Sequence, residues 1–250
     1  MSAAFGRGLA AAAVAIGLWQ FIVWAGDMKH FILPGPWRVA TALWANAGLI
    51  FENALVTFGE VLLGLVLGVA LGAVSAIQLA GSPMAQTLLR PILIFLQAVP
   101  VFALAPVLTI WFGYGIWSKV AMALLIIYFP VMSAFYDGLT RTPQGFVDLA
   151  RCMGASPARI MWHVRIPAAI PSLASGLRLA AVYAPIGAVI GEWVGASQGL
   201  GHLMLLANGR AKIDLMFAAL FVLAAFTVVL HMTIDRLADR LTTRMSDAAA

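Results

Sequence analysis

The sequence predicts an all-α, polytopic membrane protein with six transmembrane helices. Of its 250 residues, 63% are hydrophobic and 10% are charged, and the mean hydropathy is +0.98. Apolar runs long enough to cross a hydrocarbon core of about 30 Å recur along the chain. Only helices or closed barrels satisfy their backbone groups in that environment. The runs lack the period-two alternation of barrel strands, so we expect helices.

Six apolar segments are the candidate spans. They cover residues 9–25, 54–79, 91–112, 120–136, 172–190 and 215–234. A secretory signal peptide is the competing interpretation of the first segment, but no small-residue cleavage site precedes Asp27, so we expect a retained helix. A proline-stiffened loop leads from this helix into a short amphipathic helix over residues 39–49.

The basic residues predict the orientation of the spans. A formal charge of +5 and a pI near 9.9 would suggest a nucleic-acid partner in a soluble protein. Here we expect no nucleic acid, because arginines concentrate in the cytoplasmic loops of membrane proteins. With both termini in the cytoplasm, nine arginines fall inside, namely Arg7, Arg90, Arg141, Arg151, Arg159, Arg165, Arg236, Arg240 and Arg244. Five basic residues fall outside, namely Lys29, Arg38, Lys119, Arg210 and Lys212.

The titratable residues predict neither catalysis nor metal binding. The single cysteine, Cys152, excludes an intramolecular disulfide, and four separated histidines show no ligand spacing. No phosphate-binding Gly-x-x-x-x-Gly-Lys-Ser/Thr loop is present, so the chain cannot itself bind and hydrolyse ATP. We expect no catalytic residue, metal or cofactor, and energy for uphill transport would enter through a partner.

Two spans carry small residues at four-residue intervals. Gly64, Gly68 and Gly72 lie in the second span. Gly176 in the fifth span is followed by alanines at the same spacing, at residues 180, 184 and 188. Such stripes place a flat surface on one helix face and predict close packing against another helix.

The longest basic interruption, residues 142–167, predicts two short helices. Thr142 is placed to cap the first, with Pro143 in its first turn, and Gly154 to end it in a left-handed conformation. Ser156 repeats the start signal, and the second helix is expected to stop near Arg165, before Pro167. The first helix carries an apolar stripe at i, i+3, i+4 and i+7, formed by Phe146, Leu149, Ala150 and Met153.

These residues resemble the cytoplasmic EAA loop of bacterial ABC-importer permeases. Asp148-Leu149-Ala150 takes the place of Glu-Ala-Ala, Gly154 that of the glycine, and Val164-Arg165-Ile166-Pro167 that of the closing segment, at the family's spacing. Asp148 departs from the family's Glu and Leu149 from its Ala. The alternative is a helix pair lying on the membrane surface, with arginines near anionic lipid.

The resemblance covers roughly residues 31–236 and implies a single permease domain over residues 1–250, of type I ABC-importer architecture. It implies a homodimer in the lipid bilayer of the bacterial cytoplasmic membrane, ATP-binding subunits in the cytoplasm and an external solute-binding protein. Residues 142–167 would couple to the ATPase, through Asp148, Leu149, Ala150, Arg151, Met153, Gly154, Ala155, Arg159 and Pro167. An ATP-independent secondary transporter or channel is the alternative, but no inverted repeat supports it.

Five residues are candidates for the translocation pathway: Glu60, Gln97, Pro100, Glu192 and Trp193. Ionisable groups at membrane depth mark functional sites, and helix-breaking prolines are tolerated where helices are buried or line a wet cavity. Glu60 could equally reach headgroup water, and Gln97 a neighbouring helix. Glu192 and Trp193 begin a glycine-rich connection, residues 191–202, that resembles the Glu-Trp and Gly-Leu-Gly stretch of the same permeases.

The solute is predicted by resemblance alone. Permeases of the nitrate, sulfonate and taurine type are similar to this chain, and residues 199–210 resemble the subgroup for hydroxymethylpyrimidine, a thiamine precursor. Glu60 and Glu192 argue against a pathway for small anions, because desolvated anions prefer positive charge or helix amino termini. A pyrimidine-type precursor is therefore expected, with sulfonate, taurine or nitrate as alternatives.

Overall fold

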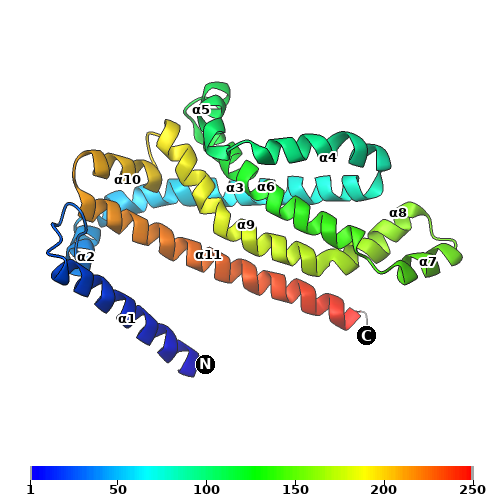
Figure 1. Ribbon diagram of the computed structural model, residues 1–250, viewed down its shortest axis with the longest axis horizontal. Helices are drawn as coiled ribbons and strands as arrows, with labels where there is room; N and C mark the ends of the chain where they lie inside the picture. Colours follow the sequence, from blue (N-terminus) through cyan, green and yellow to red (C-terminus); the bar gives the residue numbers. More distant parts are fainter. Residues whose placement is uncertain (1, 249–250) are drawn as a thin grey trace. The chain divides into compact units, whose positions relative to one another are not determined.

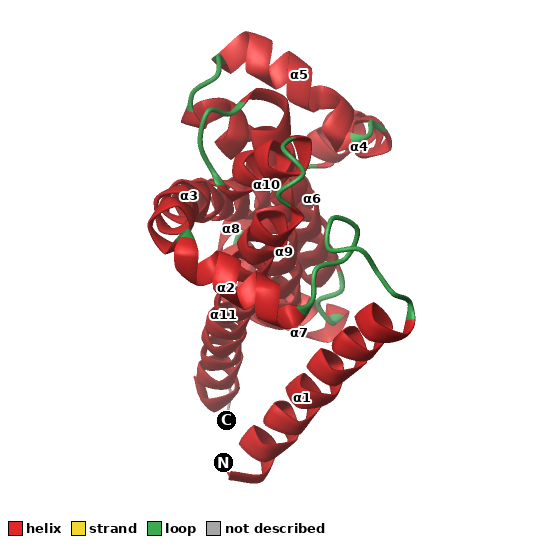
Figure 2. Cartoon of the chain, turned by 90° about the vertical axis from the view of Figure 1, so that its left-hand side faces the viewer, coloured by secondary structure: helices red, strands yellow, loops and turns green. Residues whose placement is uncertain are grey.

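A computed structural model describes residues 2–248, with the exception of the side chains of residues 2–5, 7–9, 12, 89–90, 93–94, 96–98 and 244–248. Within the described residues the regular secondary structure is entirely helical, with no strand, as Figure 2 shows. The helices are α1 (Ser2–Ala25), α2 (Pro36–Ala45), α3 (Ala47–Gly81), α4 (Pro83–Ala98), α5 (Val101–Phe112), α6 (Ile116–Thr140), α7 (Gln144–Cys152), α8 (Pro157–Ile160), the π-helical turn η1 (Met161–Arg165), α9 (Ile166–Gly195), α10 (Leu200–Gly209) and α11 (Ile213–Ala248).

Within the described residues, four helical stretches are long and apolar enough to cross a membrane. They are α3, α6, the run from α8 to α9, and α11, which confirm the second, fourth, fifth and sixth predicted spans. The first predicted span lies in α1, and the part of this helix whose side chains are all described, Ala13–Ala25, is apolar. Each helix extends beyond its apolar run, because caps and turns rather than hydropathy decide where a helix ends.

The third predicted span, residues 91–112, is wrong as a single helix. It consists of the end of α4 and all of α5, separated at Val99 and Pro100. Val99 is extended, with φ −76° and ψ 124°, because the ring of Pro100 disfavours helical geometry at the preceding residue. Pro91 and Pro106, by contrast, lie inside helices.

The chain forms two compact units. The first comprises residues 1–56 and 198–224, and the second comprises residues 57–197 and 225–250. In the first unit, Trp19 stacks on Phe217 and Phe221 at ring-centroid distances of 6.2 and 5.3 Å. The Gly199 amide donates to Asn53 Oδ1 at 2.8 Å and fixes the start of α10 against α3.

The second unit is built on α6 and α9, which run side by side (Figure 1). A Cβ added to Gly187 would lie 2.6 Å from Ala123 Cα, which shows that the two backbones are in direct contact. The glycine stripe of α3 lies against α6 in the same way, since a Cβ at Gly64 would lie 2.5 Å from Ala123 Cβ. The predicted close packing is confirmed, and it occurs within the chain.

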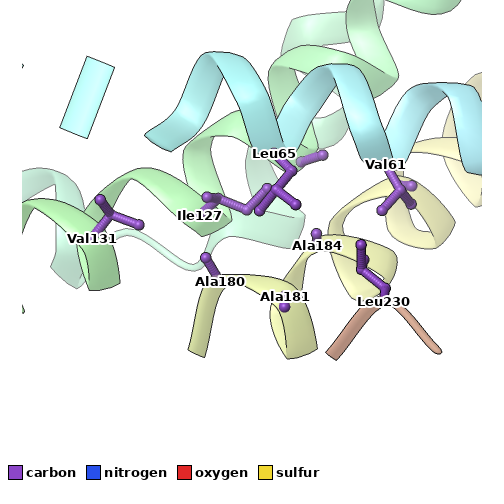
Figure 3. Close-up of a cluster of buried hydrophobic side chains, with 10 residues drawn as sticks. Val61, Leu65, Ile127, Val131, Ala180, Ala181, Ala184 and Leu230 are labelled. Atoms are coloured by element: carbon purple, nitrogen blue, oxygen red, sulfur yellow. The ribbon is translucent and has the colours of Figure 1, made fainter. Parts of the chain in front are cut away.

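The core of the second unit is aliphatic and small. In Figure 3, Val61 and Leu65 of α3 meet Ile127 of α6 and the alanines of α9, with Leu230 of α11 completing the cluster. Small side chains let helices approach closely, and dispersion contacts then hold them together without a hydrophobic driving force from water. Phe58 adds a stacked ring contact to Phe226, with centroids 3.8 Å apart.

Candidate functional site

The first candidate site is the two-helix loop, residues 142–167, whose helix α7 presents an apolar face to the surface. The side chains of Phe146, Leu149 and Met153 are 62%, 60% and 79% exposed. Val147 is the buried residue of this helix and anchors its inner side. An exposed apolar stripe on so short and otherwise polar a helix indicates a surface that another molecule covers.

The glycine turn after α7 has the predicted conformation. Gly154 has φ +77°, and no atom lies within 4 Å of a Cβ placed on it. Its amide donates to the Arg151 carbonyl and the Ala155 amide to the Ala150 carbonyl, each at 2.9 Å. This is the bonding pattern of a Schellman turn. Glycine is therefore required by the backbone conformation and not by lack of space.

The start of α7 differs from the prediction. Thr142 does not cap the helix: its Oγ1 donates backwards to the Leu139 carbonyl at 3.2 Å. Pro143 precedes the first helical residue, and no side chain caps the helix. A threonine hydroxyl can donate to a backbone carbonyl three residues earlier rather than cap the following helix, and Leu139 in the last turn of α6 provides that carbonyl. Thr142 therefore fastens the loop to α6.

The second helix of the loop does not end before Pro167. Ser156 Oγ accepts the Arg159 amide, as predicted, and α8 then continues through η1 directly into α9. The wider turn places Pro167 in the first turn of α9, and the Ile166 amide donates to the Met161 carbonyl, five residues back. A π turn accommodates a residue that lacks an N–H without ending the helix.

The polar side of the loop is exposed. Asp148 and Arg151 form an ion pair at 2.9 Å, three residues apart on α7. Arg159 and Cys152 are also exposed, and Cys152 carries a free thiol. Arg165 Nη1 donates to the Ala80 carbonyl at 3.4 Å, which ties η1 to the end of α3.

The second candidate site is a buried charge cluster formed by Thr57, Glu60, Lys119 and Glu192. All four residues are 2% exposed or less. Thr57 Oγ1 donates to Glu192 Oε1 at 2.6 Å, and Glu60 lies one helical turn after Thr57 on α3, which places it beside Glu192. Glu60 was predicted as a pathway residue on the second span and Glu192 in the connection after the fifth span, and the structure brings them together.

Lys119, like Thr57, is a member of this cluster that was not among the predicted site residues. Its Nζ donates to the carbonyls of Tyr114, Gly115 and Gly195, at distances of 2.5–2.9 Å. Gly195 is the last residue of α9, so the ammonium group caps that helix and ties it to the turn before α6. A lysine at the end of an apolar segment is typical of an interfacial residue. Lys119, Glu60 and Glu192 all lie near the outer ends of predicted spans, and this shared depth was the available signal.

A third set of charges, the Arg178 cluster, joins α9 to α11. Arg178 Nε donates to Asp235 Oδ1 at 2.5 Å and Nη2 to Asp239 Oδ1 at 2.6 Å. The two aspartates are four residues apart, which places them on one face of α11. The pairing of Arg178 with both aspartates is a finding of the structure.

The remaining predicted pathway residues are not brought into these clusters. Pro100 is exposed before α5, and Trp193 is exposed in the last turns of α9. The side chain of Gln97 lies outside the described residues. Glu192 and Trp193 were expected in a glycine-rich connection, but α9 continues to Gly195, and only residues 196–199 separate it from α10.

Metal binding finds no support in the described part of the chain, where no group of three His, Cys, Asp or Glu side chains is suitably placed.

The comparisons with known proteins agree with this architecture. A probable ABC transporter permease of Haemophilus influenzae is 49% identical over 91% of this chain and 93% of its own length. The formylaminopyrimidine transport permease of Halalkalibacterium halodurans is 32% identical over 84% of each chain. The riboflavin transport permease of Chloroflexus aurantiacus is 34% identical, over 85% of this chain and 80% of its own.

Among solved structures, the inward-facing MetNI methionine ABC transporter has the same fold. It matches with a TM-score of 0.60 and 20% identity, over 84% of this chain and 98% of its own. The polytopic helical architecture predicted from the sequence is therefore that of type I ABC-importer permeases. Residues 64–247 match the family described as "binding-protein-dependent transport system inner membrane component". The chain belongs to this family and is a permease subunit of an ABC importer.

Proposed function

We propose that this chain forms the solute pathway of an ATP-driven importer and that α7 is the element through which a cytoplasmic ATP-binding subunit moves it. The observation that carries the proposal is the exposed apolar stripe of Phe146, Leu149 and Met153. A short amphipathic helix with anchors at this spacing is suited to a hydrophobic groove on a partner. The ion-paired Asp148 and Arg151, with Arg159, would set the register along that groove.

The connections of the loop support transmission of movement. Thr142 fastens the start of α7 to α6, while α8 and η1 continue without a break into α9. A displacement of α7 would therefore act on α6 and α9 together. These two helices are in backbone contact at Gly187, so they would move as one body.

We further propose that the two compact units act as a single permease domain, working by alternating access in a dimer of two copies. An external solute-binding protein would deliver the solute, and the chain itself would hydrolyse nothing and carry no cofactor. Both termini would lie in the cytoplasm, on the side of residues 142–167. The exposed Pro100 and Trp193 would border the pathway, together with Gln97. The buried Glu60 and Glu192 would hold α9 in position beside it.

For the solute we propose a nitrogen heteroaromatic compound of the aminopyrimidine class. Two relatives more than 30% identical to this chain are named for formylaminopyrimidine and riboflavin transport. Relatives named for taurine and aliphatic sulfonates are 27–28% identical. An exposed indole such as that of Trp193 could stack on a heteroaromatic ring, whereas a sulfonate would offer it no flat surface.

The coupling role is tested by co-purification from the native membrane. We expect the wild-type chain to recover a nucleotide-binding subunit and Gly154→Asp to lose it, because only glycine adopts the φ of +77° easily. Gly145→Asp is the matched control, since Gly145 lies in the first turn of the same helix with no atom within 4 Å of an added Cβ.

Equal recovery with Gly154→Asp, in protein that is fully inserted, would contradict the coupling role. Purified protein without any such subunit would favour the ATP-independent transporter. In the latter case α7 would be a membrane-surface helix.

A further inference from the structure

The charges of the buried cluster do not balance if every group is ionised. Glu60 and Glu192 would contribute two negative charges and Lys119 one positive charge. Within this cluster, these are the charged groups that act on Glu60. An uncompensated charge in a protein interior is strongly disfavoured, so one of the two carboxyl groups is expected to be neutral.

Lys119 does not neutralise either carboxylate by hydrogen bonding. An ammonium group has three hydrogens, and all three are directed to the carbonyls of Tyr114, Gly115 and Gly195. The ammonium therefore acts on Glu60 and Glu192 only through space. The carboxyl groups must be satisfied by other donors.

The two carboxyl groups are neighbours. Thr57 bonds Glu192, and Glu60 lies one helical turn after Thr57 on α3, so two ionised carboxylates, which are acceptors only, would repel each other there. Glu192 Oε1 accepts the hydroxyl of Thr57, as an ionised carboxylate would. Glu60 Oε2, in contrast, is buried without a hydrogen-bond partner, which costs less in a neutral carboxyl group than in a charged one.

We propose that Glu60 and Glu192 form a proton-binding site that holds one proton between the two carboxyl groups, with Glu60 as the residue that carries it. One proton makes the cluster of Glu60, Glu192 and Lys119 neutral. It also removes the repulsion between two neighbouring carboxylates. The inference concerns the permease chain alone and does not depend on the proposed coupling or solute.

A proton fits this site better than a metal cation. The ammonium of Lys119 lies close enough to act on both carboxyl groups and would repel a second cation. The oxygen ligands are also too few, since the described residues contain no group of three acidic or histidine side chains around a point.

The site is tested by infrared spectroscopy of the full chain in lipid nanodiscs near neutral pH. The sequence has only three glutamates, Glu52, Glu60 and Glu192, so glutamate labelled with 13C at the side-chain carboxyl group marks few positions. We expect an isotope-shifted stretch of a protonated carboxyl group in the wild-type protein. Labelled glutamate that shows only the ionised carboxylate stretch would overturn the proposal.

Two substitutions assign the signal. Glu60→Gln and Glu192→Gln should each abolish the protonated band, because either leaves one carboxylate to balance Lys119 without a proton. Glu52→Gln is the matched control: Glu52 is exposed on the same helix as Glu60, and its replacement should leave the band unchanged. The proposal would also be contradicted if the band remained in both Glu60→Gln and Glu192→Gln, or if it disappeared in Glu52→Gln. The spectrum of the labelled wild-type protein tests for a protonated glutamate even if a variant does not fold.

Discussion

Two sets of charges tie α9 to other helices, and they differ in their access to solvent. In the buried charge cluster, the Lys119 ammonium caps α9 with all its hydrogens on backbone carbonyls. In the Arg178 cluster, the arginine side chain is 33% exposed and its aspartates 45% and 64%. A charge removed from water must be fully satisfied inside the protein, whereas a charge that keeps water contact needs no particular partner.

The buried charge cluster should therefore contribute strongly to the free energy of unfolding, and the Arg178 cluster should contribute little. This difference can be tested by substitutions of decreasing expected effect. The free energy of unfolding would be measured in detergent micelles by denaturant titration followed through tryptophan fluorescence.

Lys119→Met should have the largest effect. Removing one member of a buried charge group leaves the rest uncompensated, which typically costs about 3–5 kcal/mol. The carbonyls of Tyr114, Gly115 and Gly195 would lose their donor as well. Lys212→Met, at an exposed lysine between α10 and α11, is the control and should unfold like the wild type. If the unfolding curves of Lys119→Met and Lys212→Met coincided, the buried charge cluster would contribute no more to stability than an exposed lysine.

Gly187→Ala should come next, because it forces apart the helices on which Lys119 depends. The added methyl group would meet Ala123 Cα at 2.6 Å and the Met122 carbonyl at 3.3 Å, which are backbone atoms that cannot turn aside. We expect a loss of about 1–3 kcal/mol from overpacking.

Gly59→Ala adds the same methyl group where no atom lies within 4 Å, so it serves as the control. A gain of about 0.5–1 kcal/mol is expected for an alanine in place of a helical glycine at this position. If Gly187→Ala were equally stabilising, the close contact between α6 and α9 would not exist.

Arg178→Gln should cost at most about 1 kcal/mol, as expected for ion pairs that keep contact with water. The loss should shrink further at high salt, since exposed charges are screened. Arg240→Gln, at an exposed arginine on α11, is the control and should show no loss. A cost near that of Lys119→Met would show that the Arg178 cluster is shielded from solvent and that the comparison fails.

Asp148→Asn should have the smallest effect on stability. It removes an exposed ion pair between residues three apart on α7, and such pairs contribute about 0.2–0.5 kcal/mol. A double-mutant cycle with Arg151→Gln isolates the pair, and Asp137→Asn at the exposed end of α6 controls for the loss of a charge. A coupling energy above 1 kcal/mol would show that the Asp148–Arg151 pair contributes as strongly as a buried ion pair, contrary to this expectation.

The sequence predicted the features that depend on neighbouring residues. Four of the apolar spans, the left-handed Gly154 and the cap by Ser156 are all set by interactions within a few positions along the chain. The glycine stripe on α3 was also predictable, because the spacing of small residues fixes a helix face. Its partner helix was not predictable, since any helix with small side chains could have filled that role.

The errors came from local rules that the surroundings override. Pro167 was expected to end a helix, but one extra residue in η1 lets the helix continue. Thr142 was expected to cap α7, but it bonds the Leu139 carbonyl instead. Lys119 was missed because its role depends on Gly195, 76 residues away in the sequence. Contacts of this kind are set by tertiary packing and leave no local pattern.

The π turn η1 also sets a rotational phase. An α-helix advances by about 100° per residue, so one extra residue in a turn rotates everything before it relative to everything after it by that angle. The direction in which α7 presents Phe146, Leu149 and Met153, relative to the buried face of α9, therefore depends on the number of residues in Met161–Arg165. A deletion of one residue there would keep every side chain of α7 and aim its apolar stripe in a different direction.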